Sequence, residues 1–251
     1  LFVSKASGEF PEEGENLVVS LGTVEAAMRR VYTPKLEDRR SIGVDVARYG
    51  VDQSVITYLH GYKFVGRKAL AKRDTMEVTG EVINFCNEHG KPDVISVDET
   101  GLGAGVVDAL RDAQRNGVLD RQIDIRGVQF GAAVQCDITG CEHKTCEKSK
   151  YVNVKARMFN LLGEDLRAGL CLPEQDIYLK ELPTILYRFD KVGRLYIESK
   201  DEYKKRTGLG SPDHADSLAL ANFGRYDSLG IGKFNTAYNY DAPTHSGGMN
   251  Y

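Results

Sequence analysis

The sequence lacks any long hydrophobic stretch. No apolar run approaches the roughly 20 residues that a helix needs to cross a bilayer, and no basic segment followed by an apolar one opens the chain. These absences argue against a membrane protein and against secretion. With 251 residues, of which 41% are hydrophobic and 27% charged, the chain is typical of one globular domain with appendages.

Positive charge and cysteine are also scarce. The net charge is −3, so the basic surplus common among nucleic-acid binders is missing. This is weak evidence against such a function, because a metal site lined by carboxylates itself adds negative charge. The five cysteines are expected to be reduced thiols, with Cys86 and Cys171 in the core. The phosphate-binding motif G-x-x-x-x-G-K-[ST] is absent, so we expect no ATP hydrolysis.

Alternating apolar segments and turns predict a mixed α/β fold. The predicted order is strand, strand, strand, helix, strand, helix, strand, over residues 42–47, 54–59, 63–70, 75–89, 94–97, 106–115 and 125–130. Three meandering antiparallel strands, followed by alternating helices and parallel strands, form a mixed central sheet with helices on both faces. A further helix is expected over residues 23–31, capped by Thr23.

The chain is expected to divide into three parts. Because it begins with Leu1 and not Met, residues 1–40 are interpreted as the tail of an upstream region. Residues 41–226 form the globular domain, and residues 227–251, rich in Gly, Tyr and Asn, are expected to be a flexible tail.

An insertion over residues 134–150 contains three cysteines and one histidine within eleven positions. Three thiolates and an imidazole are a ligand set that zinc accepts, although this spacing is not a familiar finger pattern. The alternative is a reduced surface loop. The four residues are Cys136, Cys141, His143 and Cys146.

Four aspartates form the candidate catalytic set. Asp45 interrupts an apolar strand, where a carboxylate is costly unless it is paired or binds metal. Asp98 follows the fourth predicted strand, at its carboxyl end, where ligands gather in α/β sheets. Asp213 and Asp216 begin a helix three residues apart, on one face. Any one of them alone is more often a cap or turn residue, but together they predict a site for two hard divalent cations that cleaves phosphodiesters.

Two neighbouring features remain open to two interpretations each. The glycines at 101, 103 and 105 either cradle a phosphate at a helix N-terminus or allow tight packing between strand and helix. A basic cluster before Asp213 is either a solvated turn or a loop that contacts DNA phosphates beside the metals. Its members are Lys200, Lys204, Lys205 and Arg206.

Three segments resemble, in order and spacing, the nuclease motifs of tailed-phage terminase large subunits. They are residues 43–48 with Gly50 and Asp52, residues 97–110, and residues 211–218. Residues 8–11 resemble the segment that joins the packaging ATPase to this nuclease, and the resemblance extends over roughly residues 5–225. The Asp-x-x-Asp helix start also resembles RuvC-type junction resolvases.

The resemblance implies an RNase H-like, metal-dependent endonuclease that cuts concatemeric viral DNA during packaging. It implies Mg²⁺ or Mn²⁺ as cofactor in a two-metal site, with Asp45 bridging the ions, Asp98 binding one and the Asp213/Asp216 pair the other. His214 falls between two family patterns and is not assigned. The implied partners are double-stranded DNA, the upstream ATPase domain to which residues 1–40 would lead, the portal and the small terminase subunit. The implied location is the host cytoplasm, without membrane.

Three rival functions are considered. A packaging module that binds DNA or the portal without cutting would show no metal-dependent nicking. A RuvC-like junction resolvase shares the fold. Actin-like sugar kinases also begin with Gly-Val-Asp, as at residues 43–45, but need a second phosphate-binding half and a longer chain.

Overall fold

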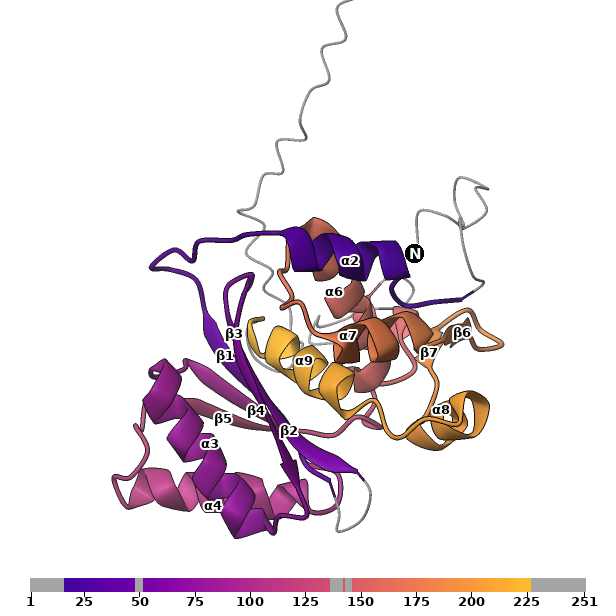
Figure 1. Cartoon of the computed structure of the whole chain (residues 1–251). Helices are drawn as coiled ribbons and strands as arrows, with labels where there is room; N and C mark the ends of the chain where they lie inside the picture. Colours follow the sequence, from indigo (N-terminus) through magenta and orange to yellow (C-terminus); the bar gives the residue numbers. More distant parts are fainter. Residues whose placement is uncertain (1–15, 48–51, 136–141, 143–145, 227–251) are drawn as a thin grey trace, which may run out of the picture.

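A five-stranded sheet lies at the centre of the structure, a computed structural model that describes residues 16–47, 52–135, 142 and 146–226 (Figure 1). The strand order is β3-β2-β1-β4-β5. The strands β1 (Arg40–Asp45), β2 (Gln53–His60) and β3 (Lys63–Ala71) are antiparallel, and β4 (Val94–Asp98) and β5 (Asp124–Val128) run parallel to β1. This confirms the predicted mixed sheet of three antiparallel strands followed by parallel ones.

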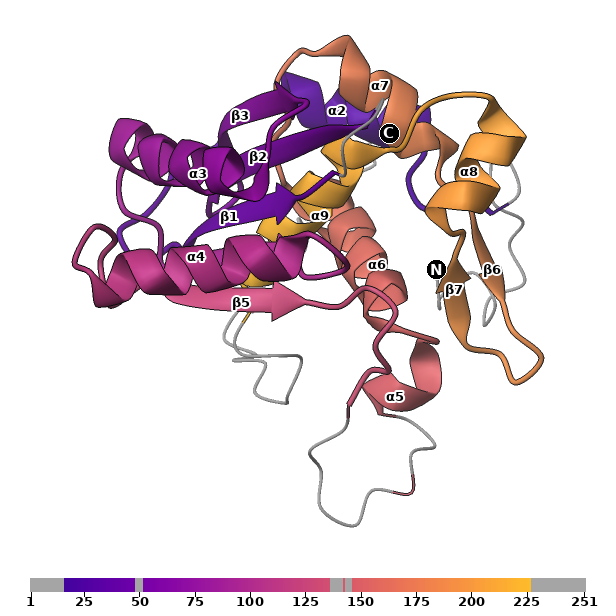
Figure 2. The ribbon, with the colours of Figure 1, turned by 90° about the horizontal axis from the view of Figure 1, so that it is seen from below.

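Helices cover both faces of the sheet (Figures 1 and 2). On one face lie α3 (Thr75–His89) and α4 (Gly103–Arg115). On the other face α9 (Asp213–Gly224) contacts β1, β2 and β4. The helices α6 (Val154–Ala168) and α7 (Asp176–Glu181) pack against α9, and α2 (Leu21–Arg29) packs against α6 and α7. The period-two alternation of β1 places Ile42 and Val44 in the core under α3 and α4, so Asp45 points to the α9 side.

Gly43 lets α9 approach the sheet closely. A Cβ atom at this position would lie 2.2 Å from both the Ala221 backbone nitrogen and the Ser217 carbonyl oxygen, so only glycine fits. The Ser217 hydroxyl donates to the Gly43 carbonyl at 3.1 Å. All 12 residues of α9 are buried. The start of α9 is therefore held firmly beside the end of β1.

Two helix starts show how local residues set the boundaries. Asp74 and Glu77 form a capping box at α3. At α4, a Cβ on Gly103 would lie 1.6 Å from the Asp98 carbonyl oxygen, so this glycine serves tight packing between β4 and α4. The expected Thr23 cap is wrong: α2 begins at Leu21, because the Ser20 hydroxyl accepts from the Thr23 backbone nitrogen at 3.2 Å.

The predicted basic loop before Asp213 is a helix, α8 (Lys200–Thr207). Ser199 and Glu202 form a second capping box, and Gly208, with φ of 69°, ends the helix. The S-x-x-E pattern that signals this start is present in the sequence. The chain reaches α8 from a small antiparallel pair, β6 (Tyr187–Phe189) and β7 (Leu195–Ile197), which follows a 3₁₀ turn, η1 (Leu182–Thr184).

The segment around α2 packs against the same hydrophobic core as the later helices. Val18, Val19, Val24 and Ala27, near and within α2, share a hydrophobic core with α6 and α9. The division of the chain at residue 41 stays a prediction, and residues 1–15 and 227–251 lie outside the described ranges.

Cys86 and Cys171 are buried, as expected. None of the described helices combines the length and apolar character needed to cross a membrane.

Candidate functional site

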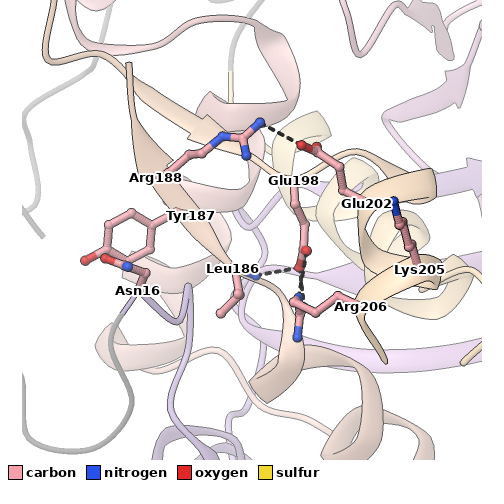
Figure 3. Close-up of a pocket in the computed structure, with 8 residues that line it drawn as sticks. All are labelled: Asn16, Leu186, Tyr187, Arg188, Glu198, Glu202, Lys205 and Arg206. Atoms are coloured by element: carbon pink, nitrogen blue, oxygen red, sulfur yellow. Dashed lines mark hydrogen bonds and ion pairs between the residues drawn. The ribbon is translucent and has the colours of Figure 1, made fainter. Parts of the chain in front are cut away.

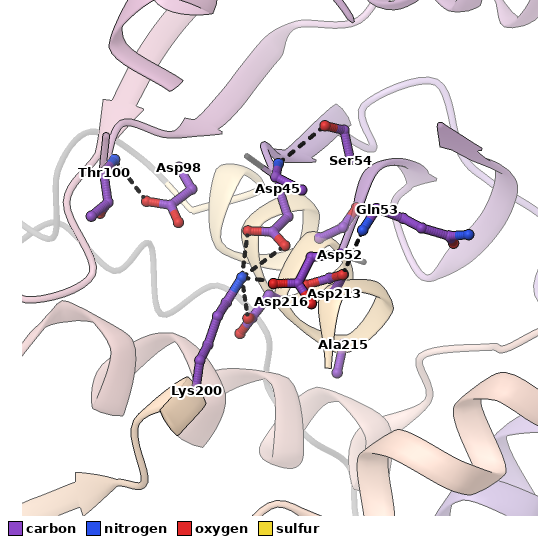
Figure 4. A network of polar contacts seen from close by, with 12 residues as sticks. Asp45, Asp52, Gln53, Ser54, Asp98, Thr100, Lys200, Asp213, Ala215 and Asp216 are labelled. Atoms are coloured by element: carbon purple, nitrogen blue, oxygen red, sulfur yellow. Dashed lines mark hydrogen bonds and ion pairs between the residues drawn. The ribbon is translucent and has the colours of Figure 1, made fainter. Parts of the chain in front are cut away.

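The four predicted aspartates lie together at one edge of the sheet (Figure 4). Asp45 ends β1 and Asp98 ends β4, and these strands are parallel neighbours, so their carboxyl ends are adjacent. Asp213 and Asp216 come from the first turn of α9. All four residues are buried, with exposed fractions of 0, 7, 5 and 0% in that order. Three elements distant in the sequence thus bring four carboxylates to one place.

The Lys200 ammonium occupies the middle of this cluster. Its Nζ atom lies 3.0 Å from Asp45 Oδ2, 3.4 Å from Asp213 Oδ1 and 3.2 Å from Asp216 Oδ2. The contact with Asp216 has the distance of an ion pair but not the alignment of a hydrogen bond, and neither Asp216 carboxylate oxygen has a hydrogen-bond partner among the described residues. A single cation is therefore shared by three buried carboxylates.

Burial and crowding shift the protonation of the cluster. Burial raises the pKa of Asp45 well above its ordinary value, and the carboxylates of Asp216, Asp213 and Asp98 raise it further, against the opposing effect of Lys200. Burial likewise raises the pKa of Asp98 and of Asp213. Backbone N–H groups of Thr100 and Gln53 oppose this, each donating at 3.0 Å to Asp98 and Asp213 respectively. More positive charge in the cluster would favour the ionised carboxylates.

The chemistry of these donors fits a divalent cation. Carboxylate oxygens are the preferred ligands of Mg²⁺ and Mn²⁺, Lys200 marks where a cation is attracted, and the Asp216 oxygens are buried without hydrogen bonds. Within the described ranges, no three His, Cys, Asp or Glu side chains already form a metal-binding group. The carboxylates are instead arranged around the Lys200 ammonium.

Glu181 caps the helix that carries two of the aspartates. Its Oε2 atom accepts from the Ala215 backbone nitrogen at 2.8 Å, and burial raises the pKa of Glu181 to about 8. Pro212, the residue at the N-cap position of α9, makes no side-chain capping hydrogen bond. Asp213 does not cap this helix, and its carboxylate accepts from the Gln53 backbone nitrogen instead. Glu181 precedes Ala215 by 34 positions, so no local sequence pattern reveals its role.

His214 lies on α9 between the two aspartates but contacts β3. Its Nδ1 atom lies 2.6 Å from Arg67 Nη1. Burial, and to a smaller extent Arg67, lower the pKa of His214 to about 4, so the imidazole is neutral near pH 7. Among the described residues, the His214 imidazole contacts Arg67 and makes no hydrogen bond to the four aspartates.

Lys204 and Arg206 of α8 pair with carboxylates other than the four aspartates. Lys204 pairs with Asp52 at 2.8 Å, and Arg206 Nε lies 3.0 Å from Glu198 Oε2. Lys205 and Arg206 line a cavity of about 530 Å³, which does not include the aspartates (Figure 3). Of the four basic residues singled out from the sequence, only Lys200 joins the acidic cluster.

Most of the predicted zinc ligands lie outside the described part of the chain. Cys136, Cys141 and His143 lie outside the described residues, and Cys146 directly precedes the short helix α5 (Glu147–Lys150). Zinc binding by this set stays a prediction.

Comparison with known proteins supports the resemblance seen in the motifs. No family model matches the chain. A curated relative, the probable terminase large subunit of Enterobacteria phage P7, is 25% identical over 241 residues, which cover 90% of this chain and 45% of the relative. The nuclease domain of the large terminase subunit of bacterial virus Sf6 matches with a TM-score of 0.70 at 18% identity, covering 82% of this chain and 98% of that domain. The chain has the fold of a terminase nuclease domain.

Two metal-bound structures share this terminase nuclease fold. The large terminase nuclease of thermophilic phage G20c with bound magnesium matches with a TM-score of 0.54 at 16% identity, over 84% of this chain and 98% of that one. A mutant of the Sf6 nuclease domain with manganese matches with a TM-score of 0.65 at 16% identity, over 82% of this chain and 98% of that one. The chain spans less than half the length of the P7 relative, so the activity of a whole terminase is not carried over with the fold.

Proposed function

We propose that this chain is the metal-dependent endonuclease part of a terminase large subunit and cuts concatemeric viral DNA during genome packaging. The observation that carries the proposal is the convergence of four buried aspartates from β1, β4 and α9 within the terminase nuclease fold. The magnesium and manganese in the similar structures support the same ions here.

Each aspartate would contribute oxygen ligands to a two-metal site. Asp45 would serve both ions, Asp98 one of them, and the Asp213/Asp216 pair the other. Divalent cations held there would neutralise charge on the phosphodiester and favour attack by water. The chain itself supplies the positioning: the Thr100 and Gln53 backbone nitrogens fix Asp98 and Asp213.

The remaining partners belong to the same proposal. The basic side chains of α8 at Lys204, Lys205 and Arg206 lie on the same helix as Lys200 and would contact the phosphates of double-stranded DNA. Lys204 and Arg206 would exchange their present carboxylate partners for phosphate. The upstream ATPase domain, the portal and the small terminase subunit would complete the packaging complex in the host cytoplasm.

A plasmid-cleavage assay tests the proposal. Wild-type protein should nick and linearise supercoiled plasmid with Mg²⁺ or Mn²⁺ and be inactive in EDTA, and Asp45→Asn should abolish cleavage without unfolding the chain. Asp124→Asn is the matched control, because Asp124 is exposed at the opposite end of the sheet and pairs with Arg126. Cleavage by Asp45→Asn at the wild-type rate refutes the metal site. DNA binding without nicking in any metal supports a non-cleaving packaging module, and selective cutting of four-way junctions supports a resolvase.

A further inference from the structure

A second buried lysine lies beside Asp216. Lys155, in the first turn of α6, is 8% exposed. Its Nζ atom donates to the Glu198 carbonyl oxygen at 3.1 Å and lies 4.0 Å from Asp216 Oδ1. Lys200 lies 3.2 Å from the other oxygen, Oδ2. The Asp216 carboxylate is thus flanked by two lysines, one from α6 and one from α8.

The two lysines are held differently. Lys200 contacts three carboxylates and its side chain is 31% exposed, whereas the Lys155 side chain is 9% exposed and Asp216 is the carboxylate within ion-pair distance of it. The Lys155 backbone nitrogen also donates to the Phe130 carbonyl at 3.0 Å. Lys155 is therefore fixed by its surroundings, and a metal held at the cluster centre would displace Lys200 rather than Lys155.

We propose that Lys155 is a positioning residue for the metal centre and the permanent counter-ion of Asp216. It attracts Oδ1, which leaves Oδ2 turned toward the other aspartates. This inference rests on the proposed metal-dependent function.

The same charge acts in opposite directions on two measurable quantities. In the metal-free protein the Lys155 ammonium compensates a buried carboxylate and so stabilises the fold. When a divalent cation binds at the carboxylates, the ammonium repels it and weakens its binding. A lysine that served only for packing would, when replaced, lower stability and metal affinity together.

The test replaces Lys155 by two neutral residues. Lys155→Met keeps most of the apolar stem of the side chain. Lys155→Gln keeps a hydrogen-bond donor for the Glu198 carbonyl, so that this variant isolates the charge. Melting is measured in EDTA, Mn²⁺ binding by calorimetry, and plasmid cleavage as a function of Mn²⁺ concentration. Lys150→Met is the control, because Lys150 pairs with Glu147 at 3.0 Å, is 39% exposed in its side chain and does not contact the aspartates.

We expect both Lys155 variants to melt at lower temperature in EDTA and to bind Mn²⁺ about tenfold more tightly, because a unit charge close to the divalent ion has been removed. Cleavage at saturating Mn²⁺ should be slower, since Asp216 is no longer oriented, and the Lys150 variant should match wild type in melting and Mn²⁺ binding. Unchanged or weaker Mn²⁺ binding in the Lys155 variants, with wild type binding Mn²⁺ and cutting, overturns this inference alone. A wild-type protein that binds no Mn²⁺ overturns the proposed function and this inference with it.

Discussion

Replacement of Lys200 by methionine should destabilise the metal-free protein and make its stability strongly dependent on metal. Methionine preserves most of the apolar stem of the side chain but removes the charge that lies within 3.4 Å of Asp45, Asp213 and Asp216. Those carboxylates have side-chain exposures of 1, 7 and 0%, so solvent cannot replace the lost partner.

The magnitude follows from the cost of leaving buried charge uncompensated. Removing one partner of a buried ion pair costs about 3–5 kcal/mol, and we take the lower end, about 3 kcal/mol, because the Lys200 side chain is 31% exposed. For a domain of this size each kcal/mol corresponds to about 2–4 °C, so the melting temperature in EDTA should fall by about 6–12 °C. Lys205→Met, a change on the same helix at an exposed lysine, should cost under about 0.5 kcal/mol.

The pH and metal dependence of this loss separate charge from packing. The pKa values of Asp45, Asp98 and Asp213 are raised in the fold. In the folded protein these carboxyls therefore become charged only as pH rises past the pKa values of the unfolded chain and through the raised pKa values of the fold. The deficit of Lys200→Met should therefore be larger at pH 8 than at pH 5, and saturating Mn²⁺ should recover most of it. Thermal melts at both pH values, with EDTA and with Mn²⁺, are the assay. An equal deficit at both pH values, or one that Mn²⁺ does not reduce, refutes the reasoning.

Three further variants or measurements probe the same region. Asp213→Asn and Asp216→Asn should both impair plasmid cleavage, and Asp213→Asn should impair it more because Asp213 matches the terminase pattern. Asp213→Asn should also melt near the wild-type temperature in EDTA, because an amide oxygen still accepts from the Gln53 backbone nitrogen. Normal cleavage by Asp213→Asn reverses the ranking. In thermal melts, Glu181→Gln should be more stable than wild type by a few kcal/mol at pH 8 and nearly equal to it at pH 5. The reason is that the pKa of Glu181 is raised to about 8, so the wild-type protein loses stability as pH rises from about 4.5 to 8. A variant that is less stable than wild type at pH 8 contradicts this. Elemental analysis of chelator-free protein should find about one zinc per chain, and its absence leaves the reduced loop for residues 136–146.

The elements that the sequence predicted well are those whose signals are local. The alternation in Ile42, Val44 and their neighbours identifies β1 and assigns Asp45 to the opposite face, because side chains on a strand alternate strictly. The helix over residues 75–89 agrees with α3, whose periodic face and capping box are both short-range patterns. The same kind of local signal, Ser199 followed by Glu202, marks the start of α8, so the segment expected as a loop is a capped helix.

The parts of the site that the sequence did not reveal depend on long-range contacts. Lys200 could be named as basic but not placed among three carboxylates, since its contact with Asp45 joins residues 155 positions apart. The Glu181 cap and the Lys155 contact likewise depend on how α7 and α6 pack against α9. Periodicity shows which face of an element is buried, but not which charged side chain of another element meets it.

The acidic cluster therefore has a physical cost that the rest of the fold must offset. Buried carboxylates with too few cations destabilise a protein, and here burial raises the pKa of three of the four aspartates. The surrounding contacts oppose any relaxation: α9 is fully buried, lies against Gly43 without room for a Cβ atom, and is capped by Glu181. An arrangement that holds carboxylates together against their repulsion gains stability from any divalent cation that binds it. Its rigid support is thus more readily explained by metal binding than by any contribution of the aspartates to the fold itself.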